Sequence, residues 1–532
     1  MDSTTRHRAM SVKLWPPSQS TRLMLVERMI NNLITPSIIS RKYGLLSKEE
    51  AEVDAKIIEE QAFSRATIHH ETEPDGDGSS AVQIYAKESS NLMIEVLKRG
   101  PKSNDPDYKK PSIVSQISSF DISGGRRAFI EAEEAEEIMN PLTDPDRHFT
   151  KICLSNRSFG LPAATVAQPI LSSIKHQLTE VDLSDIVAGR PESEALEVMK
   201  MLSTSLDGCN LKTLNLSNNA LGEKGVRAFE SLLRSQKNLE ELYLINDGIS
   251  EEAARAVREL LPSTSNLKLL HFHNNMTGDE GAVSIAEIVR SSPLLQDFRC
   301  SSTRIASDGG IALSEALGAC RNLQKLDIRD NMFGIPAALT LSKSLPSFAS
   351  LQCVYLSYLN LEDEGAEAIS KALLGSECPL EVLEMAGNDI TAKGAAAVAE
   401  CVAGKAGLAV VNLSENEMKD EGAVMIGKAI EKLEKVVEVD MSNNGMRRVG
   451  ARCLANAVVG KVGFKMLNIN GNYISDEGVD EIEEMFKDFK GVLGPLDEND
   501  PEGEDFDDEN DGKDDDDLYV DVGIHNLEIN PH

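Results

Sequence analysis

The sequence predicts an α/β solenoid of leucine-rich repeats, and three observations lead to that prediction. An L-x-x-L-x-L pattern occurs twelve times, and most copies begin 28 residues after the previous one. Each copy is followed by a turn and then by an amphipathic segment, as in "LKTLNLSNNALGEKGVRAFESLLRSQKN". With 41% hydrophobic residues in a chain of 532, a sizeable core can form. One strand and one helix per unit therefore stack into a horseshoe of the ribonuclease-inhibitor type.

The repeat units begin at regularly spaced apolar residues, within a repeat domain expected at residues 149–492. The spacing rises to 29 residues at Leu178 and Leu380 and to 33 at Leu211. The first positions are Phe149, Leu178, Leu211, Leu239, Leu267, Leu295, Leu323, Leu351, Leu380, Leu408, Val436 and Phe464. The extra residues before Leu211, "DIVAGRPESEALE", lengthen one strand-to-helix loop, which carries Arg190. Such loops lie on the rim where solenoids bind their partners.

A small all-helical domain is expected before the repeats, at residues 12–100, after a disordered start at residues 1–11. Helical spacing of Val26, Ile30 and Leu33 predicts one of several short helices. Trp15, the only tryptophan, stands next to two prolines. It is either buried in the small core or an exposed anchor for a partner.

Two polar stretches complete the predicted organisation. Residues 101–148 include "PKSNDPDYKKP" and are expected to form a linker followed by a cap on the solenoid. Residues 493–532 include "LDENDPEGEDFDDENDGKDDDD", which has almost nothing apolar to bury, so a disordered acidic tail is predicted. The tail either only solvates the chain or steers a basic partner.

The charge of the chain restricts its partners. The sequence has 87 acidic and 54 basic residues, a formal net charge of -33. Such a charge repels nucleic acid and anionic membranes and favours a basic protein. No segment reaches the roughly 20 apolar residues that span a bilayer, and the N-terminus lacks an apolar signal core. We therefore expect a cytoplasmic protein without direct membrane insertion.

Motifs for a nucleotide site, a hydrolase or a cofactor are absent from the sequence. There is no G-x-x-x-x-G-K-[ST] loop, no H-E-x-x-H and no G-x-S-x-G elbow. The eight cysteines lack zinc spacing and are expected to be free thiols. His271 and His273 alternate on one strand face, but no third ligand is suitably spaced, so no metal site is expected. The residues alone predict an acidic solenoid that binds another protein.

Two asparagine positions in the turns have different interpretations. The ninth residue of most units is an asparagine, such as Asn219, whose amide can bond the backbone of neighbouring turns. In the unit that begins at Leu239, Asp247 holds that place, and the asparagine comes one residue earlier, as Asn246. An amide there is free to contact a partner. Asparagines at the eighth position of other units, such as Asn274, leave a purely structural role open.

Several segments together resemble the plant-type Ran GTPase-activating proteins (RanGAPs). They are "WPP" at the start, "SDIVAGRPESEALE", "LNLSNNALGEKG", "LYLINDGIS", "FHNNMTGDEG" and the acidic tail. The likeness extends from about Val12 to the tail. The repeats alone also occur in ribonuclease inhibitors and immune receptors, whereas a WPP domain joined to these repeats and this tail is specific.

The resemblance implies an activator of the GTPase Ran and not an enzyme. RanGAPs bind Ran-GTP through the concave face and one rim, and they convert it to Ran-GDP on the cytoplasmic side of the nuclear envelope for nucleocytoplasmic transport. The nucleotide and magnesium belong to Ran, so no cofactor is expected. An activator of this class can accelerate hydrolysis by about 10⁵-fold, or about 7 kcal/mol of barrier. The alternative is a non-catalytic scaffold or inhibitor that binds a basic protein.

The catalytic residues are transferred from the family motif by motif. The family asparagine thought to lock Ran's water-orienting glutamine, in place of an arginine finger, falls on Asn246. A second family asparagine falls on Asn219. This residue is also one of the ninth-position asparagines that bond the backbone of neighbouring turns, which are called here ladder asparagines. The arginine of the "GR" loop falls on Arg190, which is expected to support the interface or the position of Asn246.

The WPP domain of plant relatives resembles an address. Coiled-coil proteins of the outer nuclear envelope capture it, and it directs the protein to division structures, spindle and cell plate, in mitosis. The targeting residues that correspond to the motif are Trp15, Pro16 and Pro17.

Overall fold

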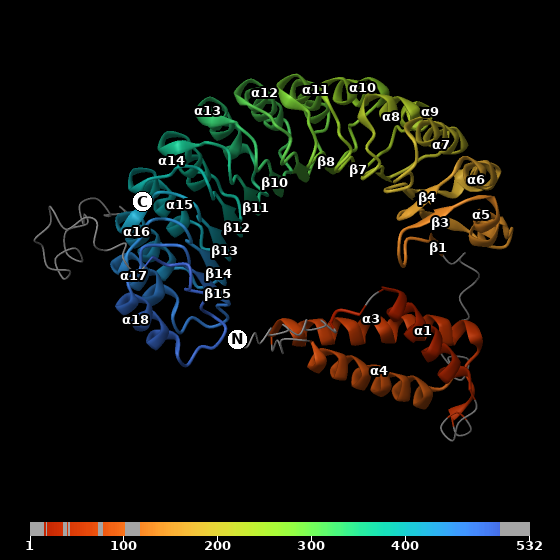
Figure 1. The fold of residues 1–532 in the computed structure, drawn as a ribbon, viewed down its shortest axis with the longest axis horizontal. Coiled ribbons are helices and arrows are strands. Elements are labelled where there is room, and N and C mark those ends of the chain that lie inside the picture. Colours follow the sequence, from red (N-terminus) through yellow and green to blue (C-terminus); the bar gives the residue numbers. More distant parts are fainter. Residues whose placement is uncertain are drawn as a thin grey trace, which may run out of the picture. The chain divides into compact units, whose positions relative to one another are not determined.

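The structure, a computed structural model, describes two compact units of the chain. The described residues are 15–17, 19–35, 40, 43–72, 78–101 and 118–500. The first unit holds the helices that precede residue 117, and the second holds nearly all of the chain from residue 118 onward (Figure 1). The predicted disordered start at residues 1–11 and the acidic residues from 501 onward lie outside the described residues.

The first unit contains long helices where the sequence predicts short ones. They are α1 (Gln19–Ile34), α3 (Lys48–Thr72) and α4 (Ser79–Arg99). The prediction of short helices was wrong for α3, because buried alanines along its 25 residues let the other helices pack closely against its whole length. These alanines are Ala51, Ala55, Ala62 and Ala66. Within the described residues of either unit, none of the helices combines the length and the apolar composition needed to cross a membrane.

The second unit is built on one parallel sheet, to which its described residues contribute 13 strands (Figure 1). The twelve predicted repeats are confirmed, each with one strand, and β1 adds a strand from the region assigned to the linker and cap. The strands are β1 (Ser118–Asp121), β3 (Phe149–Cys153), β5 (Glu180–Asp182), β6 (Thr213–Asn215), β7 (Glu241–Tyr243), β8 (Leu269–His271), β9 (Asp297–Arg299), β10 (Lys325–Asp327), β11 (Cys353–Tyr355), β12 (Val382–Glu384), β13 (Val410–Asn412), β14 (Glu438–Asp440) and β15 (Met466–Asn468). A separate pair joins β2 (Ala128–Ile130) to β4 (Arg157–Phe159).

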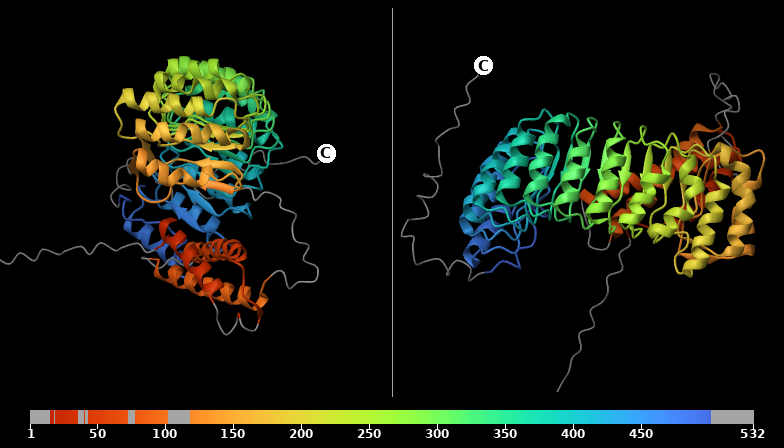
Figure 2. Two further views of the ribbon diagram at one scale, coloured as in Figure 1. Left: turned by 90° about the vertical axis from the view of Figure 1, so that its right-hand side faces the viewer. Right: turned by 90° about the horizontal axis from the view of Figure 1, so that it is seen from above.

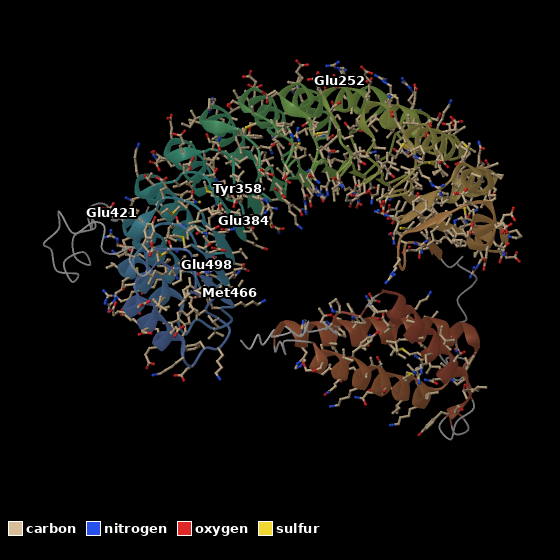
Figure 3. All side chains as sticks on the ribbon, in the orientation of Figure 1. Glu252, Tyr358, Glu384, Glu421, Met466 and Glu498 are labelled. Atoms are coloured by element: carbon tan, nitrogen blue, oxygen red, sulfur yellow. The ribbon has the colours of Figure 1, made fainter. Side chains whose placement is uncertain are left out.

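The helices of the second unit lie in a row on the convex side of the sheet (Figure 2). They are α5 (Ala132–Met139), α6 (Leu161–Ile174), α7 (Glu192–Ser205), α8 (Gly222–Ala228), α9 (Glu230–Ser235), α10 (Glu251–Leu260), α11 (Gly278–Arg290), α12 (Ser307–Leu317), α13 (Gly334–Ser344), α14 (Glu362–Leu374), α15 (Ala392–Gly404), α16 (Lys419–Glu431), α17 (Arg448–Val458) and α18 (Asp476–Phe486). Glu252 of α10 points outward from this row, whereas Glu384 of β12 points toward the concave side (Figure 3). The segment predicted as one helix near residue 229 is divided into α8 and α9 at the fully buried Phe229.

The repeat leucines form the core between the sheet and the helices. In β7, Leu242 is fully buried, while Glu241 and Tyr243 on either side of it are half-buried. Parallel pairing sets Leu242 beside Leu214 and Leu270 in the neighbouring strands. The leucines therefore line up from unit to unit, and the polar residues between them face the concave side.

Segments outside the repeats extend the second unit at both ends. At the start, α5 begins with a capping box formed by Glu131 and Glu134. At the end, Asn499 accepts a hydrogen bond from the backbone N–H of Asn472 at 2.9 Å, as a ladder asparagine does. The predicted start of the acidic tail at residue 493 was therefore too early, because residues 493–500 complete the last turn.

Candidate functional site

The turns between each strand and the following helix form one rim of the repeat unit. Backbone hydrogen bonds join neighbouring turns, since the N–H of Asn218 donates to Ile245 O at 2.9 Å and the N–H of Asn246 donates to His273 O at 3.1 Å. The backbone of this rim is thus regular and fixed. Its chemistry depends on the side chains that each turn carries.

Three asparagines at the eighth position of their units join their side-chain amides into a row, called here the amide row. Asn246 Nδ2 donates to Asn218 Oδ1 at 3.1 Å, and Asn274 Nδ2 donates to Asn246 Oδ1 at 3.0 Å. Asn246 is exposed. An amide has two N–H groups and two lone pairs on its oxygen, so Asn246 keeps one donor and one acceptor for a partner while its neighbours fix its orientation.

The early position of this asparagine also has a structural reason. Asn246 has φ of 55°, in the left-handed region, which asparagine tolerates better than most side chains. The eighth position is left-handed in other units as well, at Asn156, Asn218, Asn274 and Asn443. The shift is therefore explained by the turn itself. Asn246 differs from Asn218 and Asn274 in that its amide both donates to one neighbouring amide and accepts from the other.

Asn219 lies at the ladder position and is only 4% exposed. Its Oδ1 accepts a hydrogen bond from the backbone N–H of Ile186 at 2.9 Å. Its Nδ2 donates to Leu183 O at 2.8 Å and to Leu216 O at 2.7 Å. Backbone groups occupy its amide, which is the ladder role that the sequence left open for Asn219, and its catalytic role stays a prediction. It positions the turn that carries Asn218.

Asp247 takes the ladder place next to Asn246 and is fully buried. Its Oδ1 accepts a hydrogen bond from the backbone N–H of Asn219 at 2.8 Å, but its Oδ2 has no hydrogen-bond partner in the described part of the chain. Burial raises the pKa of this carboxyl well above its ordinary value. In the next unit, Asn275 donates to two backbone carbonyls instead. Asp247 is therefore a weaker rung than an asparagine.

Arg190 is held by the N-terminal cap. Its Nη1 forms ion pairs with Glu131 at 2.6 Å and Glu194 at 3.4 Å, and its Nη2 donates to Ser158 O at 2.8 Å. The side chain is 9% exposed. No hydrogen bond between the described residues joins Arg190 to Asn246. The bonds of Arg190 tie the extra loop to the cap, and the expectation that it supports the interface or the position of Asn246 stays a prediction.

Two hollows adjoin the amide row on this rim. One, of about 650 Å³, lies between the extra loop and the next turn, and both Arg190 and Asn218 line it. The other, of about 550 Å³, is lined by Asn246, Met276 and Met332 and is called here the methionine groove. The amide row thus connects the two hollows, since Asn218 lines one and Asn246 lines the other. Neither methionine had a predicted role, although each follows a ladder asparagine on the exposed side of its turn.

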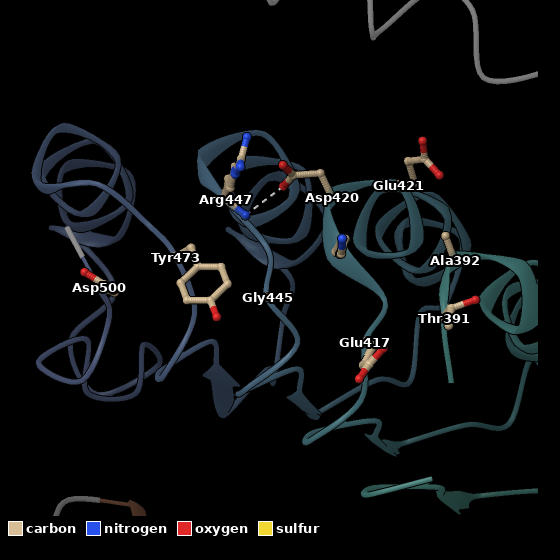
Figure 4. Close-up of a pocket in the computed structure, with 10 residues that line it drawn as sticks. Thr391, Ala392, Glu417, Asp420, Glu421, Gly445, Arg447, Tyr473 and Asp500 are labelled. Atoms are coloured by element: carbon tan, nitrogen blue, oxygen red, sulfur yellow. Dashed lines mark hydrogen bonds between the residues drawn. The ribbon is translucent and has the colours of Figure 1, made fainter. Parts of the chain in front are cut away.

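A further hollow, of about 700 Å³, lies near the C-terminal end of the same rim (Figure 4). Its lining includes Asp420, Arg447 and Tyr473. Asp420 Oδ1 accepts hydrogen bonds from the backbone N–H groups of Arg447 at 2.9 Å and Gly450 at 2.7 Å. This carboxylate therefore serves the next turn. None of the residues that the sequence assigned to a site lies there.

On the strands beside the amide row, charged side chains form pairs with one another. Asp297 Oδ1 lies 3.0 Å from His271 Nε2 and 3.0 Å from Arg299 Nε. Burial acts to raise the pKa of Asp297, but the hydrogen bonds from His271 and Arg299 outweigh it and lower this pKa to about 2. Burial and the neighbouring His271 lower the pKa of His273. In the described ranges, no group of three or more His, Cys, Asp or Glu side chains could hold a metal, and the eight cysteines are buried free thiols.

The helical unit places Trp15 in a buried aromatic cluster. Trp15 is 4% exposed, and its ring centroid lies 5.2 Å from that of Phe63 and 5.5 Å from that of Tyr85. Pro16 is exposed and Pro17 is half-buried. Of the two roles left open for Trp15, the buried one is found. The targeting role of Trp15 stays a prediction.

Known proteins match both units of the chain. A family model described as "WPP domain" matches residues 11–107, and one described as "Leucine Rich repeat" matches residues 209–229, 377–399 and 408–427. A protein of Arabidopsis thaliana named RAN GTPase-activating protein 1 is 69% identical over 504 residues, which cover 94% of each chain. The chain belongs to the Ran GTPase-activating protein family.

Two further relatives extend this comparison. RAN GTPase-activating protein 2 of Arabidopsis thaliana is 60% identical over 504 residues, 94% of this chain and 92% of its own. MFP1 attachment factor 1 of Solanum lycopersicum is 41% identical over 105 residues, 19% of this chain and 67% of its own. The chain is thus similar to these two Arabidopsis proteins along nearly its whole length, helical unit and repeats together.

Proposed function

We propose that this chain binds the GTP-loaded small GTPase Ran and accelerates its GTP hydrolysis on the cytoplasmic side of the nuclear envelope. Similarity over 94% of the chain to two proteins named RAN GTPase-activating proteins supports this activity. The observation on which the mechanism rests is the exposed, oriented amide of Asn246. Ran holds the nucleotide and its magnesium, so the chain activates an enzyme and has no nucleotide site of its own.

Asn246 is the residue that we assign to catalysis. The glutamine of a GTPase of this class orients the attacking water, and holding that glutamine is part of the activation. The spare N–H and lone pair of Asn246 fit the two ends of a glutamine amide at once. Because Asn218 and Asn274 already fix its orientation, Asn246 loses little freedom when the glutamine docks.

Arg190 does not fit the role of an arginine finger. Its guanidinium is nearly buried and bonded to Glu131, Glu194 and Ser158. Extending it toward a partner would break these bonds and leave the carboxylates unpaired. In this proposal Arg190 and Asn219 shape the rim, and neither contacts the reacting groups.

Charge and the helical unit complete the proposal. A net charge of -33 attracts a basic face of Ran to the concave side and the rim and raises the association rate. The helical unit binds coiled-coil proteins of the outer nuclear envelope. In mitosis it directs the chain to division structures, the spindle and the cell plate. In this targeting, the buried Trp15 acts by stabilising the core of the helical unit, and the exposed Pro16 acts by contacting the partner.

Single-turnover hydrolysis of GTP on purified Ran tests the activity and the residue together. We expect the intact chain to accelerate hydrolysis by orders of magnitude. Asn246→Gly should lower this rate by about 10²-fold or more, the loss typical of one transition-state amide. Glycine suits the left-handed turn, so folding measured by circular dichroism should be unchanged.

Asn443→Gly is the matched control. Asn443 is exposed and has φ of 51° at the same turn position, far along the same rim. It should retain full activity. If Asn246→Gly is also fully active, the activity stands but the residue assignment fails.

A different outcome favours a different function. If the intact chain binds Ran-GTP without accelerating hydrolysis, the chain is a scaffold or inhibitor. Equilibrium binding of labelled GTP to the isolated chain should detect no saturable site. Saturable binding would contradict a pure activator.

A further inference from the structure

The methionine groove beside Asn246 has adaptable apolar walls. Met276 and Met332 are 47% and 54% exposed, and both line the same hollow of about 550 Å³. Unbranched, polarisable methionine side chains adapt to partners of varied shape and are frequent on binding surfaces. Because the groove also includes Asn246, it continues the surface on which the GTPase is proposed to lie.

Arg304 lies in this groove, on the turn between those that carry the two methionines. It is exposed, and it makes no hydrogen bond or ion pair with any residue that the structure describes. Its φ is 60°, and the same position is glycine in two other units, Gly248 with φ of 61° and Gly445 with φ of 66°. Glycine adopts this conformation without strain, so the fold alone gives no reason for an arginine here.

Other arginines on the neighbouring strands are already paired. Arg299 forms an ion pair with Asp297, and Arg329 forms one with Asp327, each at 3.0 Å. Asp330 lines another part of the groove, and no ion pair between described residues joins it to Arg304. An unpaired guanidinium in a chain of net charge -33 marks a point that selects for a carboxylate, which it can bind with two parallel hydrogen bonds.

We infer that the methionine groove binds a segment of the GTPase that carries a carboxylate next to an apolar side chain. Arg304 pairs with the carboxylate, while Met276 and Met332 cover the apolar neighbour. This inference rests on the proposed function and adds a second contact to it. Arg304 holds the GTPase on the rim beside Asn246. It acts in association and does not supply charge to the reacting phosphate.

Steady-state hydrolysis with Ran-GTP as the varied substrate separates these roles. Arg304→Gly should raise KM about tenfold with little change in kcat, since a docking contact acts on association. The difference from the intact chain should shrink as salt is raised. Met332→Ala should raise KM by about threefold. An arginine finger would instead lower kcat at saturating Ran-GTP.

Asp389→Gly is the control for the backbone change. Asp389 is exposed and has φ of 54° at the equivalent position three units further along, away from the groove. Its replacement should leave both kcat and KM unchanged, and neither glycine variant should lower the melting temperature. Loss of activation only through kcat, or an unchanged KM in Arg304→Gly, would overturn the inference.

Binding to Ran loaded with a non-hydrolysable GTP analogue keeps the inference and the proposed function distinguishable. If the intact chain fails to accelerate hydrolysis but binds in an Arg304-dependent way, the proposed activity fails and the groove assignment survives. If the chain does not bind Ran at all, both fail. If Arg304→Gly changes only the self-association of the chain in sedimentation, the occupant is a second copy and the inference is wrong.

Discussion

Two ends of the same rim use the same backbone turn for different purposes. Around Asn246, amides bond one another and keep hydrogen-bonding capacity toward the outside. Toward the C-terminal end, Asp420 caps the next turn through its carboxylate (Figure 4). The hydroxyl of Tyr358 donates to Glu415 at 2.7 Å. The repeat thus fixes where a side chain stands. Its neighbours decide whether it remains available to a partner.

The largest effect should come from breaking the asparagine ladder at each end. Asn219→Ala and Asn416→Ala each leave buried backbone groups without a partner, so both should lower the free energy of unfolding by about 3 kcal/mol in urea titrations. Only Asn219→Ala should also reduce activation of GTP hydrolysis in the folded protein, because its turn carries Asn218. Equal losses of activity in both variants would show that the two ends do not differ.

A smaller effect is expected from arginine pairs at the two ends. Arg190→Met removes a nearly buried guanidinium from Glu131 and should lower the free energy of unfolding by about 2 kcal/mol. In the pair between Arg448 and Glu481 the arginine side chain is 43% exposed, so Arg448→Met should lower the free energy of unfolding by less than about 1 kcal/mol. Thermal unfolding of both variants checks the order, and a larger loss in Arg448→Met would reverse it.

Exchanging one rung of the ladder should give an effect of about 1 kcal/mol that depends on pH. The pKa of Asp247 in the folded chain is raised above its unfolded value of about 3.9. The contribution of this carboxyl to the free energy of unfolding is therefore fully present below about pH 4 and is lost as the pH rises through the folded pKa. Asp247→Asn should therefore raise the free energy of unfolding at pH 7 by about 1 kcal/mol, and by much less at pH 4.

The opposite exchange at the other end is the control for that prediction. Asn416→Asp places a carboxyl on a rung whose Nδ2 now donates to Met385 O and Leu413 O. It should destabilise the fold at pH 7 and recover part of the loss at pH 4. A gain from Asp247→Asn that is the same at both pH values would argue against the raised pKa.

The smallest effect is expected at Tyr358. Its hydrogen bond to Glu415 raises the pKa of the phenol to about 12, so no titration of this group should occur near neutral pH. Tyr358 is 42% exposed, and water replaces the lost bond in Tyr358→Phe. Stability should change by at most about 0.5 kcal/mol, and activation should stay constant from pH 6 to pH 9. A clear loss of activation would extend the functional surface to this end.

Much of the fold could be predicted because the repeats are local patterns. Alternation of buried leucines such as Leu242 with polar neighbours specifies a strand, and the recurring spacing specifies how the strands stack. The long α3 and the segment at residues 493–500 were missed. Both depend on packing against other parts of the chain, alanines against helices in one case and Asn499 against Asn472 in the other.

The candidate site could be predicted only in part. The sequence indicated Asn246 and the loop of Arg190, and the structure adds that Asn246 is exposed while Arg190 and Asn219 are bonded within the fold. The methionine groove was missed, because its residues come from different units and share no motif. Charge and residue type were visible, but pairing was not.

By itself the sequence determined the solenoid, the order of its two units, the acidic character and the family motifs. These follow from residue type and spacing along the chain, which need no knowledge of distant contacts. Only the tertiary structure decided that Trp15 is a core residue, that Asn219 is a buried ladder rung and that Arg304 has no partner among the described residues. Burial and pairing depend on side chains brought together from neighbouring turns and helices. The same residue type can therefore support the fold at one position and face a partner at the next.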